Sequence, residues 1–360
     1  MRRVDVDDLD DLAIGAAVLG TGGGGDPTIG KLIAKEAIRQ HGPVTVLDAS
    51  EVDDDALVVP SAMMGAPTVM LEKIPSGDEI VTAFEALQSY LGREITATTS
   101  AEAGGLNSTM PFTVAARLGI PLVDADMMGR AFPELQMCTP GLAGVKATPM
   151  AIADEKGNAA IIETVSNLWT ERLARAATIE MGCSAMIALY AMSGRQVKDT
   201  MIHGTLALCQ EIGRAIREAR AAHADPIAPT LAVLAGHRLF DGKVVDVERR
   251  TQTGFARGEA RIEGVGDDAG ATLVLQFQNE HLVALRDGRA VAMAPDLIMV
   301  VESDTGAPIT TEELRYGFRV TVLGAPCDPR WRSPEGLALV GPRYFGYDLD
   351  FVPVEELAAG

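Results

Sequence analysis

The spacing of apolar residues changes once along this 360-residue chain, near Pro226-Ile227-Ala228-Pro229. Before this point, short apolar runs alternate with segments whose apolar residues recur every three or four positions, which is helical spacing. From Gly236 onward, apolar and polar residues alternate with a period of two, as in half-buried β-strands. The chain is too long for one ordinary compact core, so we expect two structural parts.

The first part has the pattern of an α/β fold. Helices are expected over residues 7–19, 27–40, 78–91 and 106–118. Strands are expected over residues 44–47, 56–59, 94–98 and 121–123. This alternation predicts a mostly parallel sheet covered by helices, and such sheets bind ligands at the carboxyl ends of their strands.

The second part is expected to be rich in β-structure. Two helices, over 168–181 and 196–222, should flank a buried strand at Cys183–Met192. Further strands are expected over residues 236–250, 254–263, 273–277, 281–286, 297–302 and 319–323, with Asp-Gly turns at 241–242 and 287–288. We therefore predict an α/β domain over residues 1–167, which carries a glycine-rich loop, and a C-terminal domain over 168–360. In the latter, helices within 168–225 precede a barrel-like or sandwich-like β region over 236–360.

The charge balance restricts the partners. With 31 basic and 50 acidic residues the net charge is −19, which repels nucleic acid and anionic membranes. The four cysteines form no CxxC pair, the longest apolar run is too short to span a membrane, and the start of the chain turns acidic at once. We expect a protein of the reducing cytoplasm that acts on a small molecule, as a homo-oligomer, with no membrane or nucleic-acid partner.

The segment Gly20–Pro27 is the most unusual motif, because it contains four consecutive glycines. It matches GxGxxG, but a dinucleotide loop follows a strand, and this one follows a helix. Asp26-Pro27 predicts a helix start, and the carboxylate there would repel a phosphate. We instead predict that the loop holds a carbonyl-bearing ligand with its N–H groups. The predicted binding residues are Thr21, Gly22, Gly23, Gly24, Gly25 and Asp26; the alternative is a tight turn between helices.

A second glycine-containing loop follows the strand expected at 94–98 and opens the next helix. Its position suits a ligand site at the end of a parallel strand. Glu102 and Asn107 can orient a ligand by hydrogen bonds, with Gly104 and Gly105 allowing close approach. The alternative is a strand-to-helix turn in which Asn107 is only a cap.

The densest polar cluster follows the strand at 121–123. Asp124 and Asp126 point the same way if the backbone is extended, and paired carboxylates can supply a general base or hold a divalent metal. Arg130 can neutralise them or bind an anionic group, and Glu134 lies close in sequence. His203 shares a helix face with Asp199 and is a candidate acid. The alternatives are a solvated acidic loop and a structural histidine.

Four segments together resemble the S-methyl thiohydantoin desulfurase-like family, whose members are found beside hydantoinase/oxoprolinase proteins. The segments are Gly20–Pro27, Glu102–Asn107, Asp124–Pro133 and Val340–Tyr347. The resemblance covers nearly the whole chain. It implies an N-terminal α/β domain, a β-rich C-terminal domain, and hydrolysis of S-methyl thiohydantoin to hydantoin and methanethiol.

On this basis we expect water to attack the ring carbon that bears the methylthio group. Asp124 or Asp126 is the predicted base, His203 the acid, and the glycine loop holds the ring carbonyl. We expect no cofactor. Three alternatives stay open: an enzyme for another cyclic amide or small carbonyl compound, a metal-dependent enzyme, and a non-catalytic ligand-binding subunit of a hydantoinase/oxoprolinase-type complex.

Overall fold

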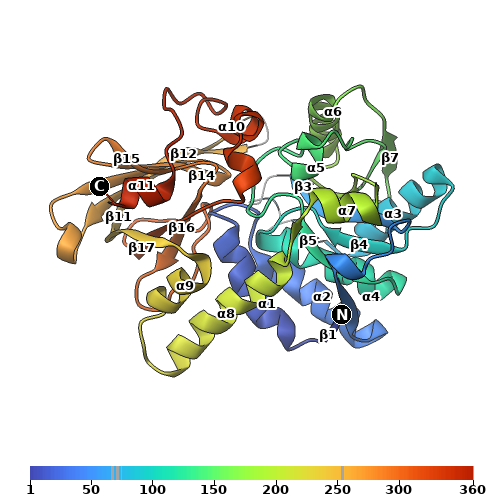
Figure 1. Ribbon diagram of the computed structural model, residues 1–360, viewed down its shortest axis with the longest axis horizontal. Helices are drawn as coiled ribbons and strands as arrows, with labels where there is room; N and C mark the ends of the chain where they lie inside the picture. Colours follow the sequence, from blue (N-terminus) through green and yellow to red (C-terminus); the bar gives the residue numbers. More distant parts are fainter. Residues whose placement is uncertain (66–68, 70–72, 74, 253–254, 360) are drawn as a thin grey trace.

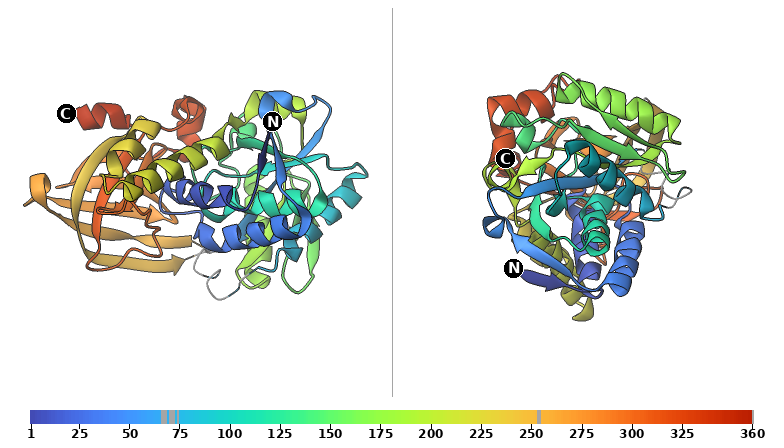
Figure 2. Two further views of the ribbon diagram at one scale, coloured as in Figure 1. Left: turned by 90° about the horizontal axis from the view of Figure 1, so that it is seen from below. Right: turned by 90° about the vertical axis from the view of Figure 1, so that its right-hand side faces the viewer.

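The computed structural model describes residues 1–65, 69, 73, 75–252 and 255–359. These residues form two sheets, each at one end of the molecule, with most of the helices packed around the first sheet (Figure 1). The chain begins beside the first sheet and ends beside the second (Figures 1 and 2). Within the described residues, no helix is both long and apolar enough to cross a membrane.

The first sheet is mixed. In spatial order its strands are β1 (Arg2–Val4), β2 (Val44–Asp48), β5 (Leu122–Asp126), β4 (Ala97–Ser100), β3 (Leu57–Gly65), β8 (Ser184–Ala188), β6 (Met150–Ala153) and β7 (Ala159–Ile162). Two short strands are added, β9 (Met192–Ser193) beside β3 and β10 (Ile202–His203) beside β5. The neighbouring strands β2, β5, β4 and β3 are parallel, whereas the remaining pairs are antiparallel.

Strand β3 explains how this sheet is covered on both faces. Its alternate residues Val58 and Ala62 belong to the core shared with α1 (Asp8–Leu19) and α8 (Thr205–Ala221). Leu57 and Val59 belong to the core shared with α3 (Asp78–Leu91) and α4 (Met110–Leu118). Successive side chains of a strand point to opposite faces, so one apolar run serves both cores. Helix α2 (Pro27–His41) packs beside α4.

Helices α1 and α8 approach each other very closely. A Cβ at Gly15 would lie 1.9 Å from the carbonyl oxygen of Cys209, and one at Gly213 would lie 1.8 Å from that of Asp11. Only glycine permits such backbone contact. This packing fixes the end of α1, from which the glycine-rich loop leaves.

The second sheet is antiparallel. Its order is β15 (Arg289–Met293), β14 (Glu280–Arg286), β13 (Thr272–Gln278), β12 (Phe255–Gly264), β11 (His237–Gln252), β17 (Arg319–Ala325) and β16 (Leu297–Glu302). In β13, buried Leu273 and Leu275 alternate with half-buried Val274 and Gln276, the period-two pattern of the sequence. Because β16 also contacts β14 and β15, the sheet curls into a half-barrel. The predicted fold class, an α/β part followed by a β-rich part, is confirmed.

The remaining helices are short or lie at the edges. They are α5 (Thr139–Leu142), α6 (Asn167–Glu180), α7 (Gly194–Thr200), α9 (Ile227–Leu234), α10 (Pro334–Val340) and α11 (Val354–Ala359). The predicted domain boundary lies between residues 167 and 168. Strands β8, β9 and β10 come after this boundary in the sequence, but they pair with strands of the first sheet.

Some predicted elements differ from the structure. The single helix expected over 196–222 is wrong, because α7 ends at Thr200, Ile202 and His203 then pair with β5, and Gly204, with a φ of 76°, is the N-cap of α8. The strand expected at 183–192 is two strands, β8 and β9, and Cys183 is exposed with a φ of +66° rather than buried.

Two Asp-Gly turns were predicted in the second sheet. The turn at 287–288 is confirmed between β14 and β15, with positive φ at both residues. The turn at 241–242 is wrong, because this pair lies inside β11, where Gly242 pairs with Gly264. Strand β15 was not predicted, and Gly254, the expected first residue of a strand, lies outside the described residues.

Candidate functional site

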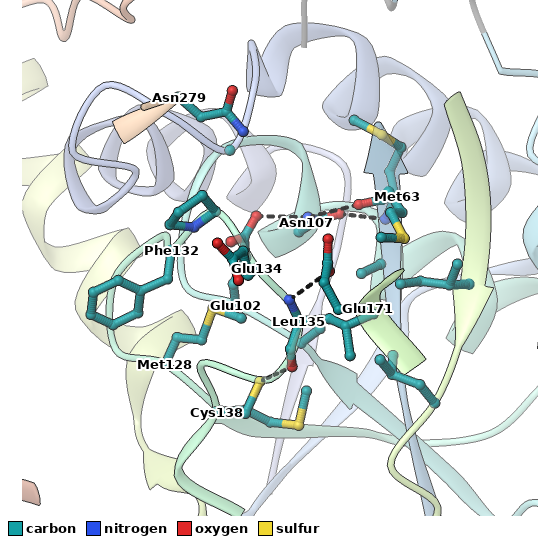
Figure 3. A pocket seen from close by; sticks show the side chains of 18 of the residues that line it. Met63, Glu102, Asn107, Met128, Phe132, Glu134, Leu135, Cys138, Glu171 and Asn279 are labelled. Atoms are coloured by element: carbon teal, nitrogen blue, oxygen red, sulfur yellow. Dashed lines mark hydrogen bonds between the residues drawn. The ribbon is translucent and has the colours of Figure 1, made fainter. Parts of the chain in front are cut away.

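A cavity of about 80 Å³ lies where the carboxyl ends of β3, β4 and β5 meet the second sheet (Figure 3). Glu102, which follows β4, forms part of one wall, and Asn279 and Glu280, at the turn between β13 and β14, form another. Glu134 and Arg175 are half-buried and border the cavity toward solvent. Ligands of α/β proteins bind at this edge of the sheet.

Glu102 and Asn107 form the central polar pair of this cavity. The Asn107 amide donates from Nδ2 to Glu102 Oε1 at 2.7 Å, and Asn107 Oδ1 accepts the Met63 N–H at 2.7 Å (Figure 3). Burial raises the pKa of Glu102 to about 7, and the hydrogen bond from Asn107, which stabilises the ionised carboxylate, opposes this rise only in part. A carboxyl group with this pKa can take up or release a proton at neutral pH.

Glu280 is the second buried carboxyl group of the cavity. Its side chain is 2% exposed, and Oε2 accepts no hydrogen bond from the described residues. Burial, and after it the negative charge on Glu102, raise the pKa of Glu280 well above its usual range. Burial thus favours the protonated form of Glu280, and the cavity brings together two carboxyl groups whose environments differ.

The glycine-rich loop separates α1 from α2 and packs directly against Glu280. A Cβ at Gly23 would lie 2.0 Å from Glu280 Oε1, and one at Gly22 would lie 2.5 Å from the His281 ring. Thr21, Gly22, Gly24 and Gly25 have φ values of 50°, 89°, 74° and 75°. The glycines are therefore required both for the turn and for the approach of the second sheet.

Hydrogen bonds of the loop connect the two parts of the chain. The carbonyl oxygen of Thr21 accepts the His281 N–H at 2.8 Å, and that of Gly22 accepts the Thr311 N–H at 2.7 Å. The carbonyl oxygen of Gly24 accepts the Leu106 N–H at 3.0 Å. Gly24 lines the cavity, so one face of this connecting loop meets the candidate ligand site.

The neighbours of the loop serve to hold it. Asp26 accepts the Thr28 N–H at 2.7 Å, which confirms the predicted N-cap of α2. Gly104 and Gly105 pack against the loop, since a Cβ at Gly105 would lie 2.3 Å from the Gly24 carbonyl oxygen.

Arg130 is fully buried and bridges the two parts of the chain. Its guanidinium donates to Thr21 Oγ1 at 2.6 Å, to the Asp296 carbonyl at 2.9 Å and to the His281 carbonyl at 3.3 Å. Burial lowers its pKa to about 10. Arg130 does not line the cavity, but its guanidinium carbon lies 4.7 Å from the ring centroid of Phe132, which does.

Two further glutamates belong to the cavity wall. Glu134 Oε2 accepts a hydrogen bond from the Tyr344 hydroxyl at 2.8 Å. Glu171 accepts the Leu135 N–H at 3.0 Å and forms an ion pair with Arg175. Burial raises the pKa of Glu171.

The rest of the wall is apolar and rich in sulfur. Met63, Met128, Phe132 and Cys138 are buried residues of this wall. Methionine adapts to irregular apolar groups and contacts other polarizable atoms favourably. Burial raises the pKa of the Cys138 thiol well above its usual range, so this cysteine stays protonated and a poor nucleophile.

The structure places the predicted catalytic carboxylates Asp124 and Asp126 outside the cavity wall. Asp124 accepts the Leu206 N–H at 2.8 Å at the start of α8 and forms an ion pair with Arg2 at 3.1 Å. Asp126 Oδ2 accepts three N–H groups, at 2.7, 2.8 and 2.7 Å, from Ala103, Met128 and Gly129. Burial nevertheless raises the pKa of Asp126 to about 6.

His203 also lies away from the cavity. It is exposed in the short strand β10, and its Nε2 is 3.3 Å from the carbonyl oxygen of Val197. The structure thus brings Glu102, Asn107, Glu134 and Gly24 together at one cavity, and leaves Asp124, Asp126 and His203 outside it. Catalytic roles for the latter three stay predictions.

Sequence reasoning missed Glu280, Asn279 and Glu171. Glu280 is the first residue of β14, directly before the strand expected over 281–286, and nothing in its local sequence distinguishes it from a surface residue. The available signal was indirect: four glycines in a row indicate that another group must approach the backbone, but not which one.

The cavity glutamates do not form a recognisable metal site. Among the residues that the structure describes, no group of three or more His, Cys, Asp or Glu side chains is arranged to hold a metal ion. Binding of a divalent metal stays an untested prediction.

Comparisons with known proteins agree with this architecture. Residues 7–164 match the family described as S-Me-THD-like, N-terminal domain, and residues 165–354 match S-Me-THD-like, C-terminal domain. A search of curated proteins found no match. A crystal structure of a protein from Chromobacterium violaceum is similar, with a TM-score of 0.79, 24% identity, and coverage of 98% of this chain and 100% of that one.

The solved structure supports the fold alone, because its sequence identity to this chain is low. The two family matches, in contrast, follow one another along nearly the whole sequence. The chain therefore belongs to the S-Me-THD-like family, the S-methyl thiohydantoin desulfurase-like family.

Proposed function

We propose that this protein is a hydrolase for a small cyclic amide that carries a methylthio group. S-methyl thiohydantoin is the substrate that we favour, and hydantoin and methanethiol are the products. The family membership supports this substrate class, and the observation that carries the reaction type is the pair of buried carboxyl groups, Glu102 and Glu280, in one cavity.

The two carboxyl groups suit the two proton transfers that such a hydrolysis requires. Glu102 has a pKa of about 7 and can act as the base, whereas burial raises the pKa of Glu280 and favours its protonated form, which can act as the acid. The negative charge on Glu102 helps to raise the pKa of Glu280, so ionisation of the base favours the protonated form of the acid. We assign the base to Glu102 rather than to Asp124 or Asp126, because only Glu102 lines the cavity.

In the attack step, Glu102 removes a proton from water while the water oxygen bonds to the ring carbon that bears sulfur. The adjacent carbon–nitrogen double bond opens, and Glu280 donates its proton to that ring nitrogen. The intermediate carries a hydroxyl and a methylthio group on the same carbon. Asn107, which holds Glu102 Oε1, keeps the base oriented.

In the second step, the carbon–sulfur bond breaks and sulfur takes the electron pair. Glu102 returns its proton to the sulfur, Glu280 removes the hydroxyl proton, and a carbonyl group forms on the ring. Both carboxyl groups regain their starting protonation, and methanethiol leaves. The apolar, sulfur-rich wall around Met128 suits the methylthio group.

The test is turnover of S-methyl thiohydantoin by the purified protein in ¹⁸O-labelled water. We expect methanethiol, detected with a thiol reagent, and hydantoin with one labelled oxygen at the former sulfur-bearing carbon. The Glu280→Gln variant, which cannot donate a carboxylic proton, should bind hydantoin but turn over at least about 100-fold more slowly.

Two results would decide against this function. Hydantoin binding without methanethiol release by the wild type would favour a ligand-binding subunit, with a hydantoinase/oxoprolinase-type partner as the enzyme. Turnover that stops after chelation and returns with a divalent metal would favour the metal-dependent reaction. A cytoplasmic location remains part of the proposal.

A further inference from the structure

The outward face of α6 carries an exposed apolar stripe. Leu168, Trp169, Leu173 and Ile179 are 41%, 47%, 47% and 48% exposed, and Ala176 between them is also exposed. Residues three or four positions apart share one helix face. Helix α6 lies at the periphery of the molecule (Figure 1), so this face is accessible to a partner.

The opposite face of α6 belongs to the interior. Glu171, Ala174 and Thr178 are buried, and Glu171 lines the cavity. The apolar residues of the outward face therefore add nothing to the core of the chain. A contiguous exposed apolar face of this kind is typical of a protein interaction site.

The stripe is symmetric in sequence about Ala176. Leu173 and Ile179 lie three positions before and after it, and Arg172 and Glu180 lie four positions before and after it. The basic residue thus precedes the centre, and the acidic residue follows it. Among the described residues, Glu180 forms no ion pair.

We propose that the protein forms a homodimer in which α6 crosses its own copy at Ala176 on a two-fold axis. A two-fold axis places position 176−n of one subunit opposite position 176+n of the other. Leu173 then contacts Ile179 of the partner subunit, and Arg172 pairs with Glu180 of the partner subunit. Each contact occurs twice, so both charges on each stripe find partners.

A small residue at the crossing point lets two helices approach closely, with the i±3 and i±4 side chains packed around it. This is the arrangement that Ala176 and its four neighbours provide. Trp169 enlarges the apolar area; its ring centroid lies 5.4 Å from the Arg172 guanidinium carbon. The opposite order of charge about one centre favours a second copy over an unrelated protein or an anionic membrane.

Cysteine cross-linking tests the crossing point. In a Cys183→Ala background, which removes the exposed native thiol, Ala176→Cys should form a disulfide-linked dimer under mild oxidation by oxidised glutathione. Ala221→Cys, at the exposed end of α8, is the matched control and should stay monomeric on a non-reducing gel. Equal cross-linking of the two variants would overturn the proposal.

Charge exchange tests the pairing. By light scattering after gel filtration, wild type should have twice the mass of one chain. Arg172→Glu and Glu180→Arg should each weaken the dimer at least about tenfold, since each places two like-charge contacts in the interface. The double variant should restore dimerisation. A monomeric wild type, or a dimer indifferent to all three variants, would contradict the crossing proposed here.

Discussion

Asp126 and Glu102 are both buried carboxyl groups at the carboxyl ends of neighbouring parallel strands, yet their surroundings differ. One oxygen of Asp126 accepts three backbone N–H groups, whereas Glu102 accepts the side-chain amide of Asn107 and lines a cavity. The three backbone donors oppose the effect of burial and hold the Asp126 carboxylate in one position, whereas Glu102 faces the open space of the cavity. We infer that Asp126 holds the loops in place and that Glu102 performs chemistry.

The largest effect should come from Glu102→Gln. This change keeps the shape and the bond from Asn107 but removes the base, so kcat should fall by about 10²- to 10⁴-fold. Thiol release under saturating substrate measures it. If Asp126→Asn lost as much activity per folded molecule while Glu102→Gln remained active, the comparison would be reversed.

The pH dependence of stability should separate the same two residues. The pKa of Glu102 is about 7 in the folded protein and about 4.3 in the unfolded chain. The protonated Glu102 therefore stabilises the folded protein fully below about pH 4.3, and this stabilisation is lost as the pH rises through 7. This loss amounts to about 4 kcal/mol. Thermal unfolding at several pH values should show that Glu102→Gln removes the loss of stability between about pH 4 and 7.

Activity should follow the opposite trend over the same pH range. Because the base must be ionised, kcat/KM is expected to rise with pH and to level off above about 7. Asp126, with a pKa of about 6, should contribute to stability loss mainly at lower pH. A profile that levels off near pH 5 would argue against Glu102 as the base.

Asp126→Asn should mainly lower stability. It removes the charge that accepts three N–H groups, so we expect a loss of about 2 kcal/mol in the free energy of unfolding. Urea denaturation measures this, with activity corrected for the folded fraction. Unchanged stability combined with lost turnover would show that Asp126 takes part in the reaction.

Gly23→Ala should affect activity through Glu280. The added Cβ would lie 2.0 Å from Glu280 Oε1, so the buried acid must move, and we expect about tenfold lower kcat. Gly119→Ala is the control for an added methyl group: there is open space around its Cβ, and its φ of 66°, unlike the φ of Gly23, adds backbone strain without a contact. Similar kcat losses in both variants would mean that the contact with Glu280 is unimportant.

Asp124→Asn and His203→Ala should have the smallest effects. Asp124 shares an ion pair with the half-exposed Arg2, so its replacement should cost at most about 1 kcal/mol. Neither residue lines the cavity, and kcat should change less than about twofold. A much larger loss of kcat in either variant would restore the original assignment from sequence.

Local patterns predicted the framework of the fold well. The apolar spacing gives α3 with the bounds Asp78–Leu91 found in the structure, and Asp26-Pro27 marks the start of α2. The loop at 102–107 was expected at a strand end, and Glu102 and Asn107 do lie at the cavity there. Such features depend on neighbours in sequence, which is why they can be inferred from it.

The features that sequence reasoning missed depend on distant contacts. Glu280 reaches the cavity only because the second sheet packs on the glycine-rich loop, and the helix expected at 196–222 is interrupted because Ile202 pairs with β5. Asp124 and Asp126 lie two positions apart in β5, so their spacing places them on one face of the strand, as expected. The spacing could not show that each carboxylate accepts hydrogen bonds from backbone N–H groups.

The bridging position of Arg130 limits how the chain can be divided into separate domains. Its guanidinium comes from the first part of the chain, but carbonyl groups at 281, 295 and 296 in the second part satisfy it. Either half expressed alone would therefore leave an orphaned cation or bare carbonyl groups at its cut surface. The two family domains, although each is recognisable in sequence, should therefore evolve together. A chimera that joins one domain of this protein to the other domain of a distant relative should fold only if the residues that contact Arg130 are transferred as well.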